Sequence, residues 1–307
     1  MSIINKINKL LDTKAAIKQA IIDKGVEVND DTVFADYPSK IAAITSGESG
    51  GGGNDSYYEN LFLATTSDNT DYSYLFNNCN KPSLDLSRFD TSKVTDMSYM
   101  FRNCDATSLD LSHFDTSKVT NMYYMFYGCI YLTSLNISNF NTSNVTTMSN
   151  MFSNCQSLTS LDVSSFDTSK VTDMGYMFYR CSSLTSIDVS NFDTSKVTDI
   201  GYMFQNCTSL TSLDVSNFDV SKITSNYNVY RAFDGCAALV DLYPPQNINA
   251  QLDVSKSTAL SHDSLMRIIN NLMVKTSTTK LILGATNLAK LSDEEKAIAV
   301  NKGWTLA

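Results

Sequence analysis

One stretch of the sequence reads Phe166-Asp167-Thr168-Ser169-Lys170-Val171-Thr172-Asp173-Met174-Gly175-Tyr176-Met177-Phe178-Tyr179-Arg180-Cys181-Ser182-Ser183-Leu184-Thr185-Ser186-Ile187-Asp188-Val189-Ser190, and it begins again with Asn191-Phe192-Asp193-Thr194-Ser195-Lys196. Each related stretch carries one cysteine. The seven cysteines are Cys79, Cys104, Cys129, Cys155, Cys181, Cys207 and Cys236, with gaps of 25, 25, 26, 26, 26 and 29 residues. A fixed period of this length is typical of stacked repeats that bury their apolar sides against their neighbours.

Apolar residues recur at set distances from each cysteine. Phe lies three residues before every cysteine, Met or Leu usually lies four before it, and Met or Ile lies seven before five of them. This spacing predicts one face of a short helix. Alternating apolar residues after the cysteine, such as Leu109 and Leu111, predict a short inward-facing strand. We therefore expect an α/β fold, a leucine-rich-repeat solenoid of about seven 25–26-residue strand-plus-short-helix coils over residues 55–236.

The end of the chain departs from the repeat. Residues 237–307 read as irregular repeats and a cap that covers the last coil. Leu252-Asp253-Val254 and Leu281-Ile282-Leu283 predict strands, and Ser261 is the expected N-cap of a helix. Ser292 and Glu295 form a capping-box pattern that opens a helix ending at Gly303.

Composition excludes several classes of protein. The 307-residue chain is 43% hydrophobic and carries a net charge of -9, so we expect a folded protein that binds no nucleic acid. No apolar run is long enough to cross a bilayer, so we expect no membrane insertion. The N-terminus Met1-Ser2-Ile3-Ile4-Asn5-Lys6 lacks the pattern of a signal peptide, and we expect no export by that route.

The cysteines all occupy one repeat position, which is unlike a disulfide framework. We interpret them as reduced thiols that pack as small apolar groups, with no disulfides. Metal ligation is the alternative, and it requires several thiolates around one ion. A single file of thiols without a nearby histidine pair does not provide this geometry, so we expect no metal and no cofactor.

Residues 1–45 show helical spacing of apolar residues, and residues 46–54 form a glycine-rich linker. The runs Thr13–Val26 and Phe34–Ile44 resemble the N-termini of many bacteriophage tail and fibre proteins, in which Ala-Ile-x-x-Lys-Gly and Tyr-x-x-Lys-Ile-x-x-Ile precede a glycine-rich linker. The resemblance implies a segment that anchors the chain to other virion proteins or forms oligomers. A small helical cap on the solenoid is the alternative.

The repeat itself resembles the BspA-type leucine-rich repeats of bacterial surface proteins. The shared pattern is Met-x-x-Met-Phe-x-x-Cys-x-x-Leu-x-x-Leu-Asp-Val-Ser-x-Phe-Asp-Thr-Ser-x-Val-Thr-x-Met, matched almost fully three times between Phe140 and Asp219. The family implies binding to surface partners such as matrix proteins or glycans, and not catalysis. Its usual members are exported and attached to the cell wall, whereas this sequence shows no export signal.

Two sets of repeated residues are expected on the surface. A tyrosine set lies five residues before the cysteines, and an acidic set lies on the outward face of the expected strands. The candidate binding residues are Tyr74, Tyr99, Tyr124, Tyr176, Tyr202, Asp85, Asp110, Asp162, Asp188 and Asp214. Aligned exposed tyrosines favour an interface, and aligned carboxylates favour a sugar or a divalent cation. Ring packing between coils and a solvated sheet face are the alternatives.

No nucleophile elbow, phosphate loop or zinc signature is present, so we expect no enzyme. The expected function is that of a bacteriophage virion structural protein, a tail or head fibre, located in the virion. Its partners would be other virion proteins through residues 1–45 and a host-surface glycan or protein through the solenoid, with the chain as a dimer or trimer. A bacterial cell-surface adhesin is the alternative, and a structural decoration without a receptor is a third possibility.

Overall fold

The structure, a computed structural model, describes residues 70–307 except 88, 226–228 and 277–278. The chain forms two compact units, Met1–Thr66 and Ser67–Ala307, and every described residue belongs to the second. The predicted helical segment 1–45 and the linker 46–54 lie outside the described residues.

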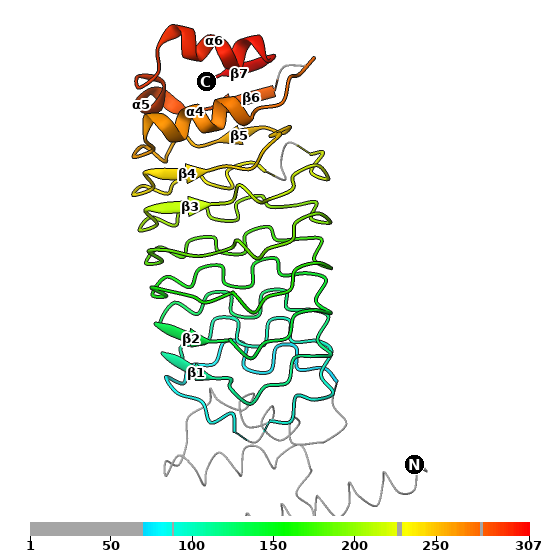
Figure 1. The fold of residues 1–307 in the computed structure, drawn as a ribbon. Helices are drawn as coiled ribbons and strands as arrows, with labels where there is room; N and C mark the ends of the chain where they lie inside the picture. The colour runs from blue at the N-terminus through cyan, green and yellow to red at the C-terminus, as the bar shows by residue number, and fades with distance from the viewer. Residues whose placement is uncertain (1–69, 88, 226–228, 277–278) are drawn as a thin grey trace, which may run out of the picture. The chain divides into compact units, whose positions relative to one another are not determined.

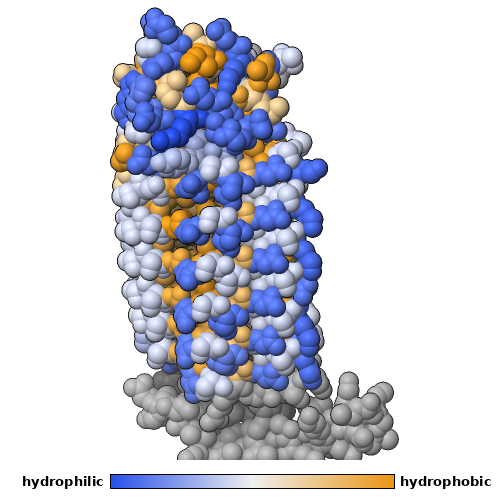
Figure 2. All heavy atoms as spheres, in the orientation of Figure 1, coloured by the Kyte–Doolittle hydropathy of each residue, from blue (hydrophilic) through white to orange (hydrophobic). Residues whose placement is uncertain are grey.

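Successive repeats lie one above another in the second unit (Figure 1). Isolated parallel bridges join Asp71 to Asp96, Asp96 to Asn121, Asn121 to Thr147, Thr147 to Asp173 and Asp173 to Asp199. Each bridge therefore spans one coil of 25 or 26 residues. Equivalent positions of the repeat consequently form columns along the stack, and Figure 2 shows residues of similar hydropathy aligned in this way.

Strands are short and few. β1 (Ser108–Asp110) pairs in parallel with β2 (Ser134–Asn136), and β3 (Ser212–Asp214) pairs in parallel with β4 (Asp241–Tyr243). Equivalent residues face each other, so that Leu109 lies opposite Leu135. The segments at Leu84, Leu161 and Ile187 form no strand.

The predicted strand-plus-helix solenoid is wrong, because no helix occurs in the described part of the repeats before Cys236. The segment predicted as helical consists of consecutive turns. Its N–H groups alternate between two kinds of partner: Met100 donates to the carbonyl of Met97, whereas Tyr99 donates to Tyr123 and Phe101 to Met125, both in the next coil. A helix requires every N–H to find its partner four residues back in the same segment.

Left-handed residues divide these turns. Tyr99 has φ 57° and Asn103 has φ 53°. The same two positions are left-handed in each of the remaining coils, from Tyr74 and Asn78 to Arg231 and Gly235. L-residues in this conformation interrupt a right-handed helix. Turns of four residues place apolar side chains at nearly the same spacing as a helix, which explains the incorrect prediction.

The core is a stack of like residues. The Phe column is fully buried, and Phe101 and Phe126 stack at 5.5 Å with an interplanar angle of 1°. All seven cysteines are free and buried. The thiol of Cys155 donates to the carbonyl oxygen of Phe126 in the preceding coil at 3.2 Å, and four other cysteines repeat this contact with the phenylalanines of their preceding coils.

Helices appear only at the C-terminal end of the described residues. The elements are β5 (Leu252–Asp253), α4 (His262–Asn271), β6 (Thr279–Ile282), α5 (Gly284–Leu288), α6 (Asp293–Asn301) and β7 (Trp304–Leu306). The three strands form one parallel sheet in the order β5-β6-β7. The predicted cap at Ser261 and the capping box of Ser292 and Glu295 are confirmed, whereas α5 was not predicted.

Candidate functional site

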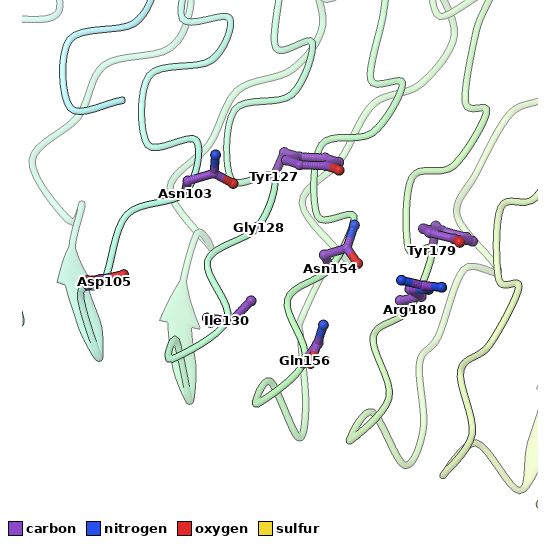
Figure 3. A pocket seen from close by; sticks show the side chains of 9 residues that line it. All are labelled: Asn103, Asp105, Tyr127, Gly128, Ile130, Asn154, Gln156, Tyr179 and Arg180. Carbon is purple, nitrogen blue, oxygen red and sulfur yellow. The ribbon is translucent and has the colours of Figure 1, made fainter. Parts of the chain in front are cut away.

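A groove of about 490 Å³ crosses four successive coils (Figure 3). Its residues come from the two positions before the cysteine and the one after it. They are Asn103 and Asp105 from one coil, Tyr127, Gly128 and Ile130 from the next, Asn154 and Gln156 from the third, and Tyr179 and Arg180 from the fourth. Figure 3 shows two slanting rows, with Asp105, Ile130 and Gln156 below Asn103, Gly128 and Asn154 of their own coils. The groove therefore runs along the stack.

The upper row stands on a fixed backbone. Asn103, Gly128, Asn154 and Arg180 are all left-handed, with φ between 53° and 72°. Each donates its N–H to a carbonyl of the next coil, as Asn154 does to Tyr179 and Arg180 to Gln205. Because both the dihedral angles and the hydrogen bonds are set by the stack, these side chains are presented in a defined arrangement before any ligand arrives.

Gly128 makes room for a neighbouring side chain. Its φ is 72°, and a Cβ at this position would overlap the Asn103 Oδ1 atom. The Asn103 side chain occupies that space and donates from its amide nitrogen to Asn78 Oδ1 at 3.0 Å. Glycine here lets an amide side chain lie flat against the neighbouring coil.

The groove combines aromatic, amide and charged groups. The Arg180 guanidinium lies over the Tyr179 ring, 5.2 Å from the ring centroid. Within the described part of the chain, Arg180 forms no ion pair. Asp105 lies at the opposite end, three coils away, so the groove has a positive charge at one end and a negative charge at the other.

The predicted tyrosine set forms two stacks and not one. Tyr74 and Tyr99 stack at 4.4 Å, Tyr99 and Tyr124 at 5.1 Å, and Tyr176 and Tyr202 at 4.5 Å. Asn150 occupies the position between Tyr124 and Tyr176. Burial raises the pKa of Tyr99 to about 12. These rings contact one another, and none of the five lines the groove.

The predicted acidic set is exposed and takes part in local turns. Asp85, Asp110, Asp162, Asp188 and Asp214 each accept the N–H of the serine two residues later, at 2.9 to 3.1 Å. Hydrogen bonds from Ser112 lower the pKa of the Asp110 carboxyl, and Ser164 does the same for Asp162. These carboxylates shape the turn after each strand position, and none lines the groove.

Reasoning from the regular repeat missed the groove because its residues are the irregular ones. Two residues before the cysteines the sequence has Asn77, Arg102, Tyr127, Ser153, Tyr179, Gln205 and Asp234, whereas three before it always has Phe. Packing between like coils favours like residues, so variation within near-copies marks positions where that demand is weaker, even though Ser153, Gln205 and Asp234 are buried. This signal was present in the sequence.

The described residues contain no group of three or more His, Cys, Asp or Glu side chains arranged to hold a metal ion. None of the helices in this part of the chain has the length and apolar run that a bilayer crossing requires.

A family model described as "Mycoplasma protein of unknown function, DUF285" matches residues 56–134 and 130–241, which is more than half of the chain. No curated protein and no solved structure matches the chain.

Proposed function

Since the chain belongs to the DUF285 family, whose description assigns no function, we propose its role from its surface: it is a binding protein that recognises a partner on a cell surface. The observation that carries this proposal is the groove across four coils. A constant core beneath the irregular residues that line the groove is the arrangement of a scaffold that presents side chains to a partner. Ligand sites of this kind combine aromatic surface with a few placed polar groups.

We place this binding protein in a bacteriophage virion, as a tail or head fibre. The support is the residue pattern of positions 1–45 and the glycine-rich stretch that follows, which resembles the pattern expected of a virion-anchoring segment. In a dimer or trimer several grooves act together, and several copies on one particle raise the avidity of weak sites by orders of magnitude. The alternative setting is a bacterial cell surface, where the chain acts as an adhesin.

Mass spectrometry of purified particles tests the setting. Peptides of this chain in phage particles from the host culture, at a constant ratio to a known structural protein, support the virion. Their recovery from the bacterial envelope and not from particles supports the adhesin.

Binding to cells tests the function itself. The purified full-length chain, labelled with a fluorophore, should bind intact host cells with saturation and be displaced by unlabelled chain. If it binds neither the host nor related bacteria above the level of a labelled unrelated protein, the chain is a structural decoration and the proposal is wrong.

A further inference from the structure

We propose that the groove from Asn103 to Arg180 binds a linear glycan that carries a carboxylated sugar, with the chain of sugars running along the stack and the carboxylate at Arg180. This inference rests on the proposed binding function and assigns it to one site and one class of ligand. It follows from the spacing, the side-chain chemistry and the charge of the groove.

The spacing of the coils suits a chain of sugars. Stacked backbone segments lie about 4.8 Å apart, and one pyranose unit of an extended glycan covers a similar length. A glycan along the groove therefore meets one coil with each sugar unit. In an extended β-linked chain successive units are turned over, so units two apart present the same face. Tyr127 and Tyr179 lie two coils apart and occupy the same repeat position.

The chemistry of the lining suits sugars better than peptide. Tyr127 offers a ring surface to the C–H face of a pyranose, as tyrosines do in sites that need both apolar and polar contact. The amides of Asn103, Asn154 and Gln156 each donate and accept, as sugar hydroxyls do. Peptide anchors need a deep apolar pocket, whereas Ile130 is the one aliphatic residue of this open lining.

The charge of the groove sets the position of the carboxylate. Arg180 is exposed and forms no ion pair among the described residues, and Tyr179 holds its guanidinium in place. Arginine binds carboxylates through two parallel hydrogen bonds. Asp105 at the other end repels a second carboxylate, so acidic units bind in one orientation. With a net charge of -9, the chain disfavours long polyanions such as nucleic acid.

The test uses the full-length chain and immobilised β-1,4-linked oligosaccharide series: cello-oligosaccharides and N-acetylated chito-oligosaccharides as neutral ligands, and the same series ending in a single glucuronate unit as acidic ones. Acidic series should be retained at least tenfold more strongly than neutral ones. Tyr127→Ala and Arg180→Gln should each weaken retention about tenfold, and Arg180→Lys should restore it only partly because lysine lacks the planar fork. Tyr131→Ala is the matched control, since Tyr131 is 51% exposed and does not line the groove.

The outcomes separate this inference from the proposed function. If the chain binds host cells and Tyr127→Ala and Arg180→Gln leave that binding unchanged, the groove is not the site and the inference is overturned while the function stands. Equal retention of neutral and acidic series overturns the role given to Arg180. Displacement from cells by a peptide fraction and not by oligosaccharides makes the partner a protein and overturns the ligand class. Loss of cell binding in the Tyr131→Ala control also removes the assignment to the groove.

Discussion

The hydroxyl of Thr142 donates to the carbonyl oxygen of Asp167 at 2.9 Å and accepts the N–H of the same residue at 2.8 Å. One side chain thus satisfies both backbone groups of a residue in the next coil. Thr116 and Thr194 make the same double contact with Asn141 and Asp219, and all three threonines are buried. This column joins the coils where no strand does.

Thr142→Val should therefore destabilise the protein although it preserves shape. The valine leaves the N–H and C=O of Asp167 without their partner, and a buried unpaired polar group costs about 1–3 kcal/mol. The free energy of unfolding measured in urea should fall by that amount. Thr146→Val is the control, because Thr146 is exposed and water replaces its hydrogen bond to Thr120. An equal fall in the free energy of unfolding of the two variants would show that the burial of the Thr142 hydrogen bonds does not add to their contribution to stability.

A second prediction concerns the left-handed tyrosines. Tyr176 has φ 58° and stacks on Tyr202 at 4.5 Å, whereas the equivalent residue one coil earlier is Asn150, also at 58°. Asparagine tolerates this conformation and a β-branched residue does not. Tyr176→Val should therefore be about 1 kcal/mol less stable than Tyr176→Asn, although both remove the same ring stack.

The same pair of substitutions at Tyr179 is the matched control for that measurement. Tyr179 lies in the same coil but outside the left-handed region, so its Val and Asn variants carry no such difference in backbone strain. Thermal unfolding of all four variants gives the comparison. A Val–Asn difference of the same size at both positions would show that side-chain polarity, and not backbone conformation, is responsible.

A third prediction concerns thiol reactivity. The contact with Cys104 and the nearby Lys81 lower the pKa of Cys79, whereas burial raises the pKa of Cys155 well above the usual value for a thiol. The thiolate is the reactive form. Brief treatment of the native chain with iodoacetamide should thus label Cys79 first, because its pKa is lowered and it is 8% exposed, whereas Cys155 is fully buried.

Peptide mass spectrometry follows the label at each cysteine. Lys81→Met should slow labelling of Cys79 by raising its pKa, and the unfolded chain in urea should label Cys79 and Cys155 at similar rates. Similar rates at these two positions in the native chain would contradict the prediction.

The sequence allowed the buried positions to be predicted but not the local structure that carries them. Phe178 and Met177 are buried as their spacing indicated, because a period reports which side chains face inward. The period does not report which carbonyl groups accept hydrogen bonds from the backbone N–H groups. The backbone N–H of Tyr99 donates to the carbonyl oxygen of Tyr123 in another coil, so sequence rules for helices, which assume partners in the same segment, fail there. They succeed at Ser292 and Glu295, whose partners lie three residues apart.

The candidate site was missed for a related reason. Regular positions such as Tyr99 and Asp110 predict a shared surface because they repeat, yet their repetition reflects contacts between coils or within turns. The groove residues Ile130 and Arg180 break the repeat. Only the stacked structure shows that such departures in four coils meet in one place.

The last prediction concerns the contact between α4 and α6. Nε2 of His262 lies 2.8 Å from Oε1 of Glu295, while Oε2 of Glu295 accepts the N–H of Ser292. The hydrogen bond with Glu295 raises the pKa of His262 above its ordinary value, with a smaller contribution from Asp263. A raised pKa in the folded state means that the charged pair stabilises the fold fully below the unfolded pKa of histidine. That stabilisation is lost as the pH rises through the higher folded value.

Glu295→Gln isolates this effect because glutamine keeps the capping box. The pKa of His262, measured by NMR titration, should fall in this variant, and the loss of stability between mildly acidic and mildly basic pH should shrink. Glu294→Gln removes the same charge from the adjacent exposed residue and should leave both quantities nearly unchanged. An equal fall of the His262 pKa in both variants would show that the general acidity of α6, and not the hydrogen bond to Glu295, raises that pKa.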